Sequence, residues 1–159
     1  MSNAFVLSLA AAVVLVLAAR LLVAPLPSRR HARVITLPEA LVAVAGIGGL
    51  ALHCGSMFFP SVISALPGTG QAMSDIDGLG TASILWYVVP AALVMIGLRR
   101  QHPAAVATVA LALSAVGITM YDGGPLTVHL TAIFVSVVVL AGVVSALVLP
   151  PWQRTVAFR

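Results

Sequence analysis

The sequence predicts an all-α integral membrane protein, a bundle of five transmembrane helices, and three observations lead to that class. Hydrophobic residues make up 61% of the 159 residues and charged residues 8%, whereas an ordinary soluble domain carries about 25% charged residues. The apolar residues form runs long enough, at about 1.5 Å per residue, to cross a hydrocarbon core of about 30 Å. All eight Arg fall in segments that five spans would place on one side of the membrane. The spans are expected at residues 4–24, 37–59, 81–98, 103–121 and 126–149 of one membrane domain, 1–159.

The first span, residues 4–24, comes before the first basic cluster. A secretory signal peptide carries its positive charge ahead of the apolar region, so this order predicts a retained helix with its N-terminus outside. Arg20, near the inner end, is expected to extend its charged head to the cytoplasmic interface. The Arg-rich loop that follows, with His31, is then cytoplasmic.

The second span begins with a helix-start signal and contains most of the unusual side chains. Thr36 and Glu39 form the pattern of a capping box, and Pro38 stands where a helix needs no backbone donor. Small and polar residues then recur at three- and four-residue spacing along one face, which allows a second helix to pack closely there. These residues are Gly46, Gly49, His53 and Met57.

The outer loop, residues 60–80, is the longest connection. A short interfacial helix is expected at its start, and its Gly and Pro content predicts an irregular remainder. The third span carries Trp86 near its outer end and Pro90 in its middle, and it ends at two Arg followed by His102. Asp122 opens a tight turn between the fourth and fifth spans.

Charge placement predicts the orientation and the compartment. Every Arg lies on one face of the five-span arrangement and every Asp on the other, so the positive-inside rule places the C-terminus in the cytoplasm. The protein is therefore expected in a bacterial cytoplasmic membrane, with the lipid bilayer as its surroundings. The net charge of +4 comes from Arg in short loops rather than from a basic face, which argues against nucleic-acid binding.

The candidate site collects soft-ligand side chains toward the outer face. His53 and His129 are expected at similar depths, and imidazole with thioether or thiolate is the ligand set that copper(I) prefers. The alternative is structural, because a His inside a bundle is often satisfied by a Ser or Thr of a neighbouring helix. A b-type haem is a third interpretation, weakened by the lack of a second His pair and of outer basic residues. The candidate ligands are His53, Met57, His129, Met120 and Cys54.

Three features of the chain together resemble those of a known group of proteins. They are an Arg-rich first loop, a second helix ending in His-Cys-Gly-Ser-Met, and a His near the start of the last span. The chain resembles small actinobacterial multi-pass membrane proteins of unknown function, which are distantly similar to the membrane domain of copper-resistance proteins. The resemblance implies copper handling, but the denser His and Met runs of such families are missing from this chain.

The spans contain no recognisable catalytic motif and no acid for a proton relay, since Glu39 is explained as a helix cap. We therefore expect a non-catalytic accessory or self-assembling subunit that packs through the Gly46/Gly49 face, within a homo-oligomer or a larger membrane complex. Copper or another soft metal at an outward-facing site is the alternative function. The expected helix-packing glycines are Gly46, Gly49, Gly117 and Gly142.

Overall fold

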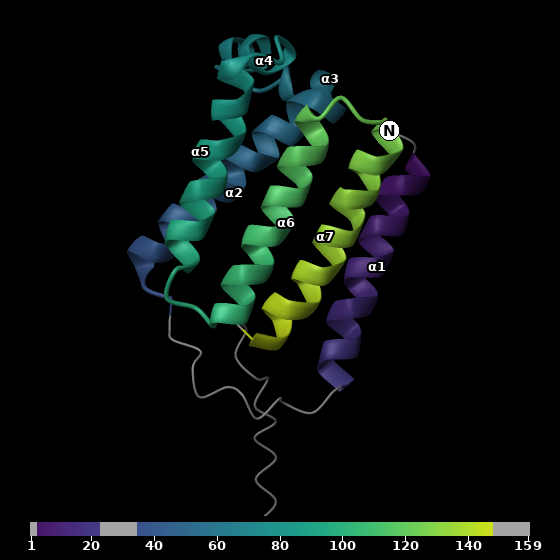
Figure 1. Ribbon diagram of the computed structural model, residues 1–159, viewed down its shortest axis with the longest axis vertical. Coiled ribbons are helices and arrows are strands. Elements are labelled where there is room, and N and C mark those ends of the chain that lie inside the picture. The colour runs from purple at the N-terminus through teal and green to yellow at the C-terminus, as the bar shows by residue number, and fades with distance from the viewer. Residues whose placement is uncertain (1–2, 23–34, 148–159) are drawn as a thin grey trace, which may run out of the picture. The chain divides into compact units, whose positions relative to one another are not determined.

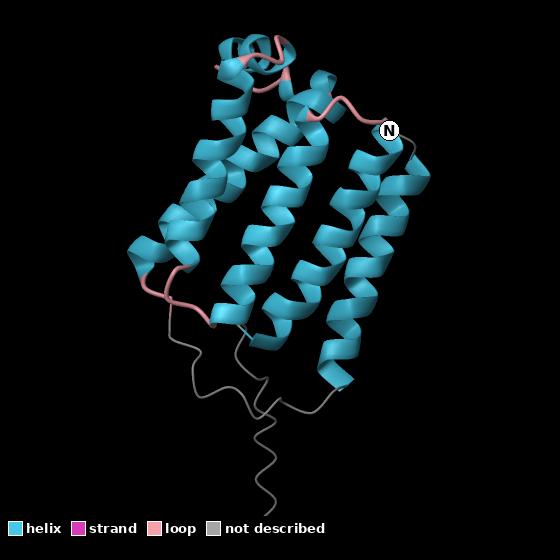
Figure 2. Cartoon of the chain, viewed as in Figure 1, coloured by secondary structure: helices cyan, strands magenta, loops and turns pink. Residues whose placement is uncertain are grey.

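The computed structural model describes residues 3–22 and 35–147, and every regular element in these ranges is a helix (Figures 1 and 2). Four of the helices are long and apolar enough to cross a membrane, namely α2, α5, α6 and most of α7. The seven helices of the described ranges are α1 (Asn3–Leu22), α2 (Leu37–Phe58), α3 (Pro60–Ile63), α4 (Gly70–Asp77), α5 (Thr81–Leu98), α6 (Pro103–Tyr121) and α7 (Leu126–Leu147).

The all-helical class is confirmed for the described residues, and the helices begin within a residue of the expected spans. The first expected span falls on α1, whose apolar stretch with described side chains is Leu7–Val16. The count of five spans stays a prediction. The expectations for the Arg20 side chain, for the loop with His31 and for the tail after residue 147 lie outside what the structure describes.

The chain divides into two compact units, and the expectation of one membrane domain stays a prediction. The first unit holds α2, α3, α4 and α5, and the second holds α1, α6 and α7. In the second unit, α7 packs against both α6 and α1. The turn between α6 and α7 forms as expected, because the Asp122 carboxylate accepts a hydrogen bond of 2.8 Å from the Gly124 N–H, and Gly123 adopts a φ of +71°.

The first unit is organised around an antiparallel pair, α2 against α5 (Figure 1). Buried residues in both helices recur at alternating steps of three and four, or at seven, which is the seam of a left-handed helix pair. The seam runs from small residues at one end to polar residues at the other. Its members are Glu39, Ala43, Gly46, His53 and Ser56 in α2 and Ser83, Tyr87, Pro90, Val94 and Gly97 in α5.

The connection at residues 60–80 is more ordered than expected. A short helix does form at its start, but the expected irregular remainder is wrong, because α4 occupies Gly70–Asp77. Ala72 and Ile76, four residues apart, are both buried as α4 packs on α2 and α5. The Thr69 hydroxyl holds the turn before α4 by donating to the Ile63 carbonyl at 2.8 Å. Burial of these two side chains thus stabilises α4, although Gly and Asp have low helix propensity.

Candidate functional site: the α2–α5 seam and its outer end

The small-residue end of the seam allows the two backbones to touch. A Cβ atom built on Gly46 would lie 2.6 Å from the Pro90 carbonyl oxygen and 2.7 Å from the Val94 nitrogen. One built on Gly49 would lie 2.6 Å from Pro90 Cγ, and one on Gly97 would lie 2.7 Å from the Ala43 nitrogen. The Gly46/Gly49 face therefore contacts α5 of the same chain, which leaves no room there for a helix of another chain.

Gly48 lies on a different face of α2. It is exposed, and a Cβ built on it would meet no atom within 4 Å. Ala45 and Ala51, one turn before and one turn after it, are exposed as well. The described residues thus show a second small-residue face on α2, defined by Ala45, Gly48 and Ala51, that the α2–α5 pair does not use.

The other end of the seam is buried and polar. The rings of His53 and Tyr87 meet edge to face with centroids 5.6 Å apart, and both side chains are at most 5% exposed. Ser56 and Ser83 are buried one step further along the seam, and the Ser56 hydroxyl donates to the Leu52 carbonyl at 2.8 Å. Burial of these polar side chains between the helices holds His53 in place and fixes the register of α2 against α5.

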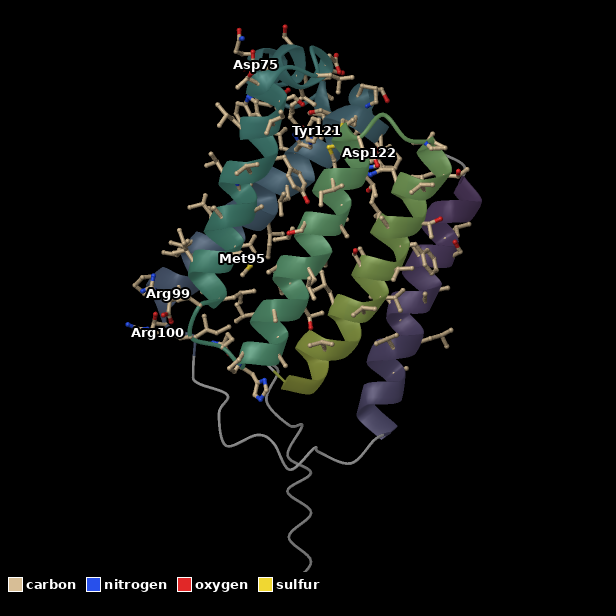
Figure 3. All side chains as sticks on the ribbon, in the orientation of Figure 1. Asp75, Met95, Arg99, Arg100, Tyr121 and Asp122 are labelled. Atoms are coloured by element: carbon tan, nitrogen blue, oxygen red, sulfur yellow. The ribbon has the colours of Figure 1, made fainter. Side chains whose placement is uncertain are left out.

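The end of this unit at α4 carries a carboxylate that is hydrogen-bonded to an indole. Trp86 Nε1 donates to Asp75 Oδ2 at 3.1 Å, and the Gln71 amide donates to Asp75 Oδ1 at 2.8 Å. In Figure 3, Asp75 lies at one end of α5, and Arg99 and Arg100 lie at the other. The sequence places Trp86 near the end of the third expected span, but its bond to Asp75 was not foreseen, because no sequence signal joins residues eleven positions apart.

His129 has a partner within the second unit. Its Nδ1 atom lies 3.0 Å from the Thr119 hydroxyl oxygen, which joins the start of α7 to the end of α6. The same hydroxyl donates to the Ala115 carbonyl at 2.9 Å. When the hydroxyl proton is donated to that carbonyl, Nδ1 is the donor in the imidazole contact. Thr119 is one of the neighbouring hydroxyls that the structural interpretation of His129 requires.

The remaining candidate ligands are divided between the units. Cys54 follows His53 directly on α2, and Met57 lies one turn further along the same helix. Both are half-buried, as is Met120 at the end of α6. Among the described residues, no group of three or more His, Cys, Asp or Glu side chains could hold a metal ion. A copper site that also uses Met ligands and joins His53 to His129 stays a prediction.

The last two expected packing glycines belong to the second unit. A Cβ built on Gly142 would lie 3.7 Å from Val16 Cγ1, an ordinary contact between α7 and α1. Gly117 is half-buried in α6. His102 caps α6, since its Nδ1 accepts a hydrogen bond of 3.2 Å from the Ala104 N–H.

Comparison with protein-family models, with curated proteins and with solved structures found no match for this chain.

Proposed function

We propose that this chain is a non-catalytic, self-assembling subunit of a bacterial cytoplasmic membrane. It crosses the bilayer five times, with its N-terminus outside and its C-terminus in the cytoplasm. Four helices of membrane-spanning length and the one-sided placement of Arg support this topology. The proposal differs from the sequence expectation in the surface that it uses, because α5 of the same chain covers the Gly46/Gly49 face.

One observation carries the self-assembly proposal, namely the exposure of Gly48 in the middle of α2. A glycine inside a helix costs about 0.5–1 kcal/mol relative to alanine. Gly46 offsets that cost through contact with the α5 backbone, and Gly49 through contact with the Pro90 ring. Gly48 has no such contact within 4 Å. A helix of a second molecule packed on it would supply the missing contact.

The surroundings of Gly48 fit a helix rather than a bulky partner. Ala45 and Ala51 keep the surface flat, and Leu41 and Val44 form an exposed apolar ridge beside it. In a bilayer, helices associate through such small residues because the backbones approach closely and gain van der Waals contact. A two-fold pair would place the Ala45/Gly48/Ala51 face of one copy against the same face of its partner.

Disulfide crosslinking in native membranes tests this interface. Gly48→Cys is made in a Cys54→Ala background and oxidised, and the products are separated without reductant. We expect a product of twice the chain mass. Leu111→Cys, at a 72% exposed position of α6, is the control and should remain monomeric. Absence of a Gly48→Cys dimer, or equal crosslinking at both positions, would contradict the proposal.

A bulky substitution gives a second measurement. Gly48→Leu should lower the dimer fraction in mild detergent, measured by light scattering, because the side chain holds the two helices apart. It should leave the unfolding temperature of the isolated chain unchanged, since nothing in the chain lies within 4 Å of that position. A dimer fraction equal to that of the original chain would count against this face.

A further inference from the structure

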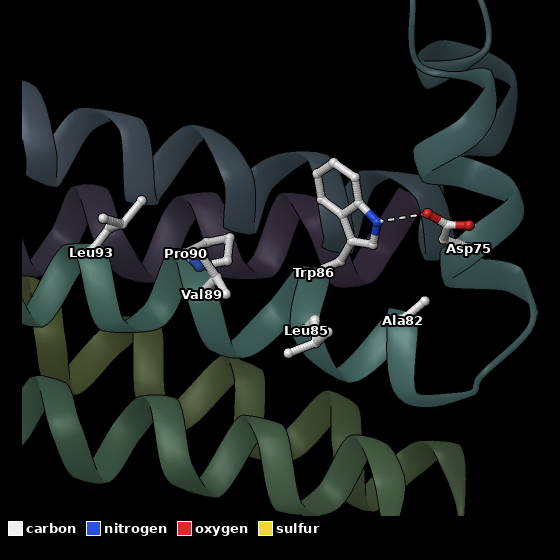
Figure 4. A pocket seen from close by; sticks show the side chains of 7 residues that line it. All are labelled: Asp75, Ala82, Leu85, Trp86, Val89, Pro90 and Leu93. Atoms are coloured by element: carbon white, nitrogen blue, oxygen red, sulfur yellow. Dashed lines mark hydrogen bonds between the residues drawn. The ribbon is translucent and has the colours of Figure 1, made fainter.

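An open groove of about 490 Å³ runs along α5 and ends at Asp75 of α4 (Figure 4). Two lines of side chains at four-residue spacing form its wall, and all of them belong to the first unit. The lining is apolar apart from the Asp75 carboxylate and the indole N–H that it binds. The apolar residues that line it are Ala82, Leu85, Trp86, Val89, Pro90 and Leu93.

The groove has the length of one leaflet. Ala82 and Leu93 mark its ends, and at 1.5 Å per residue they are about 16 Å apart along α5. Half of a hydrocarbon core of about 30 Å is about 15 Å. With Trp86 and Asp75 at the membrane surface, a groove of this length would reach the middle of the bilayer.

The polar end of the groove carries uncompensated negative charge. Asp75 accepts hydrogen bonds from the neutral groups of Gln71 and Trp86, and it forms no ion pair with any residue that the structure describes. The sequence contains no Lys or Arg between residues 34 and 98. A cation supplied from outside the chain would balance this carboxylate.

We propose that the groove binds one phospholipid with a primary ammonium headgroup. One acyl chain lies against Leu85, Val89 and Leu93, and the ammonium donates a charge-assisted hydrogen bond to the half-buried Asp75 carboxylate. Trp86 holds the carboxylate oriented toward the groove through the 3.1 Å bond drawn in Figure 4.

The chemistry selects among headgroups. A phosphatidylethanolamine ammonium has N–H donors for the carboxylate, whereas the quaternary ammonium of phosphatidylcholine has none. An anionic phosphatidylglycerol headgroup is repelled by Asp75. The expected order of binding is phosphatidylethanolamine, then phosphatidylcholine, then phosphatidylglycerol.

Native mass spectrometry measures this preference directly. The whole protein is reconstituted in vesicles of the three phospholipids in equal amounts, released, and its retained lipids are counted. We expect one retained phosphatidylethanolamine, and about tenfold less of it in Asp75→Asn, because a neutral acceptor replaces a charged one. Asp77→Asn is the matched control, an exposed acid of the same helix outside the groove, and should retain the lipid.

A second pair of variants tests the groove without changing charge. Val89→Trp fills the groove, whereas Val88→Trp places the same bulk on a neighbouring position that does not line it. The two valines are 52% and 50% exposed. We expect loss of the retained lipid in Val89→Trp alone. Equal retention of all three lipids by the original chain, or equal retention by both members of either pair, would overturn the proposal.

Discussion

The Nε atom of Arg100 lies 3.3 Å from the Glu39 carboxylate oxygen Oε1, and this ion pair joins the first turn of α2 to the chain just after α5. The other carboxylate oxygen, Oε2, accepts hydrogen bonds from the Thr36 N–H and hydroxyl at 3.1 and 2.8 Å. Glu39 is the only acid in the predicted spans, and it is 6% exposed. Its charge is thus balanced at the small-residue end of the seam.

Glu39→Gln should lower the unfolding temperature in detergent, because glutamine still accepts from Thr36 but cannot pair with the Arg100 guanidinium. Arg100→Gln should have a larger effect, because it leaves the 7% exposed Glu39 carboxylate without its ion-pair partner, whereas the 54% exposed Arg side chain that remains in Glu39→Gln is solvated. A double-mutant cycle isolates the pair. Strictly additive effects of the two substitutions would show that the pair contributes nothing.

Gly46→Ala should destabilise the fold by roughly 1–3 kcal/mol, because the added Cβ would lie 2.6 Å from a backbone oxygen that cannot move aside. Gly48→Ala is the matched control on the same helix, with no atom within 4 Å, and should be neutral or stabilising by up to about 1 kcal/mol. Denaturant unfolding of the monomer measures both. Equal tolerance of the two substitutions would contradict the close crossing of α2 and α5.

Thr119→Val should lower the free energy of unfolding by about 1 kcal/mol, because valine keeps the volume but removes the hydroxyl that contacts His129. Thr131→Val is the control, since the exposed Thr131 hydroxyl bonds only the Thr127 carbonyl of its own helix. Unfolding curves in the same detergent compare the two variants. If Thr119→Val lowers the free energy of unfolding no more than Thr131→Val does, the hydrogen bond does not position His129.

The copper interpretation has its own test. If His53 and His129 share copper(I) with Met57, then His53→Ala or His129→Ala should abolish stoichiometric binding, because only one imidazole and one thioether of this set remain. Met120→Leu, which keeps the volume, should weaken binding less. Elemental analysis after titration with copper(I) measures the metal, and a Soret band would report haem instead. Copper below one equivalent in the original chain would leave both histidines a packing role.

Cysteine labelling tests the orientation. In a Cys54→Ala background, Asp77→Cys should react with a membrane-impermeant maleimide in intact cells, because the proposed topology places the connection at residues 60–80 outside the cell. Ala104→Cys, an exposed position two residues after His102, should react only after the membrane is opened. Labelling of both positions in intact cells would refute the five-span arrangement.

The sequence by itself predicted the helical class, the start of α2 and the turn at Asp122. Each of these depends on neighbouring residues. An apolar run has the length of a span whatever it packs against, and the Thr36 and Glu39 groups that form the capping box are three residues apart. The five-span count and the orientation rest on the same local signals and on Arg placement, and they stay predictions.

Tertiary structure decided which faces are used. In α2 apolar residues occur on every face, so hydrophobic periodicity does not distinguish Gly46, which contacts α5, from Gly48, which does not. Likewise, α4 forms because Ile76 becomes buried. The hydrogen bond from Trp86 to Asp75 forms only when α4 packs against α5. These contacts join residues through space, and the free energy that forms them comes from burial and pairing between segments, which local sequence patterns do not contain.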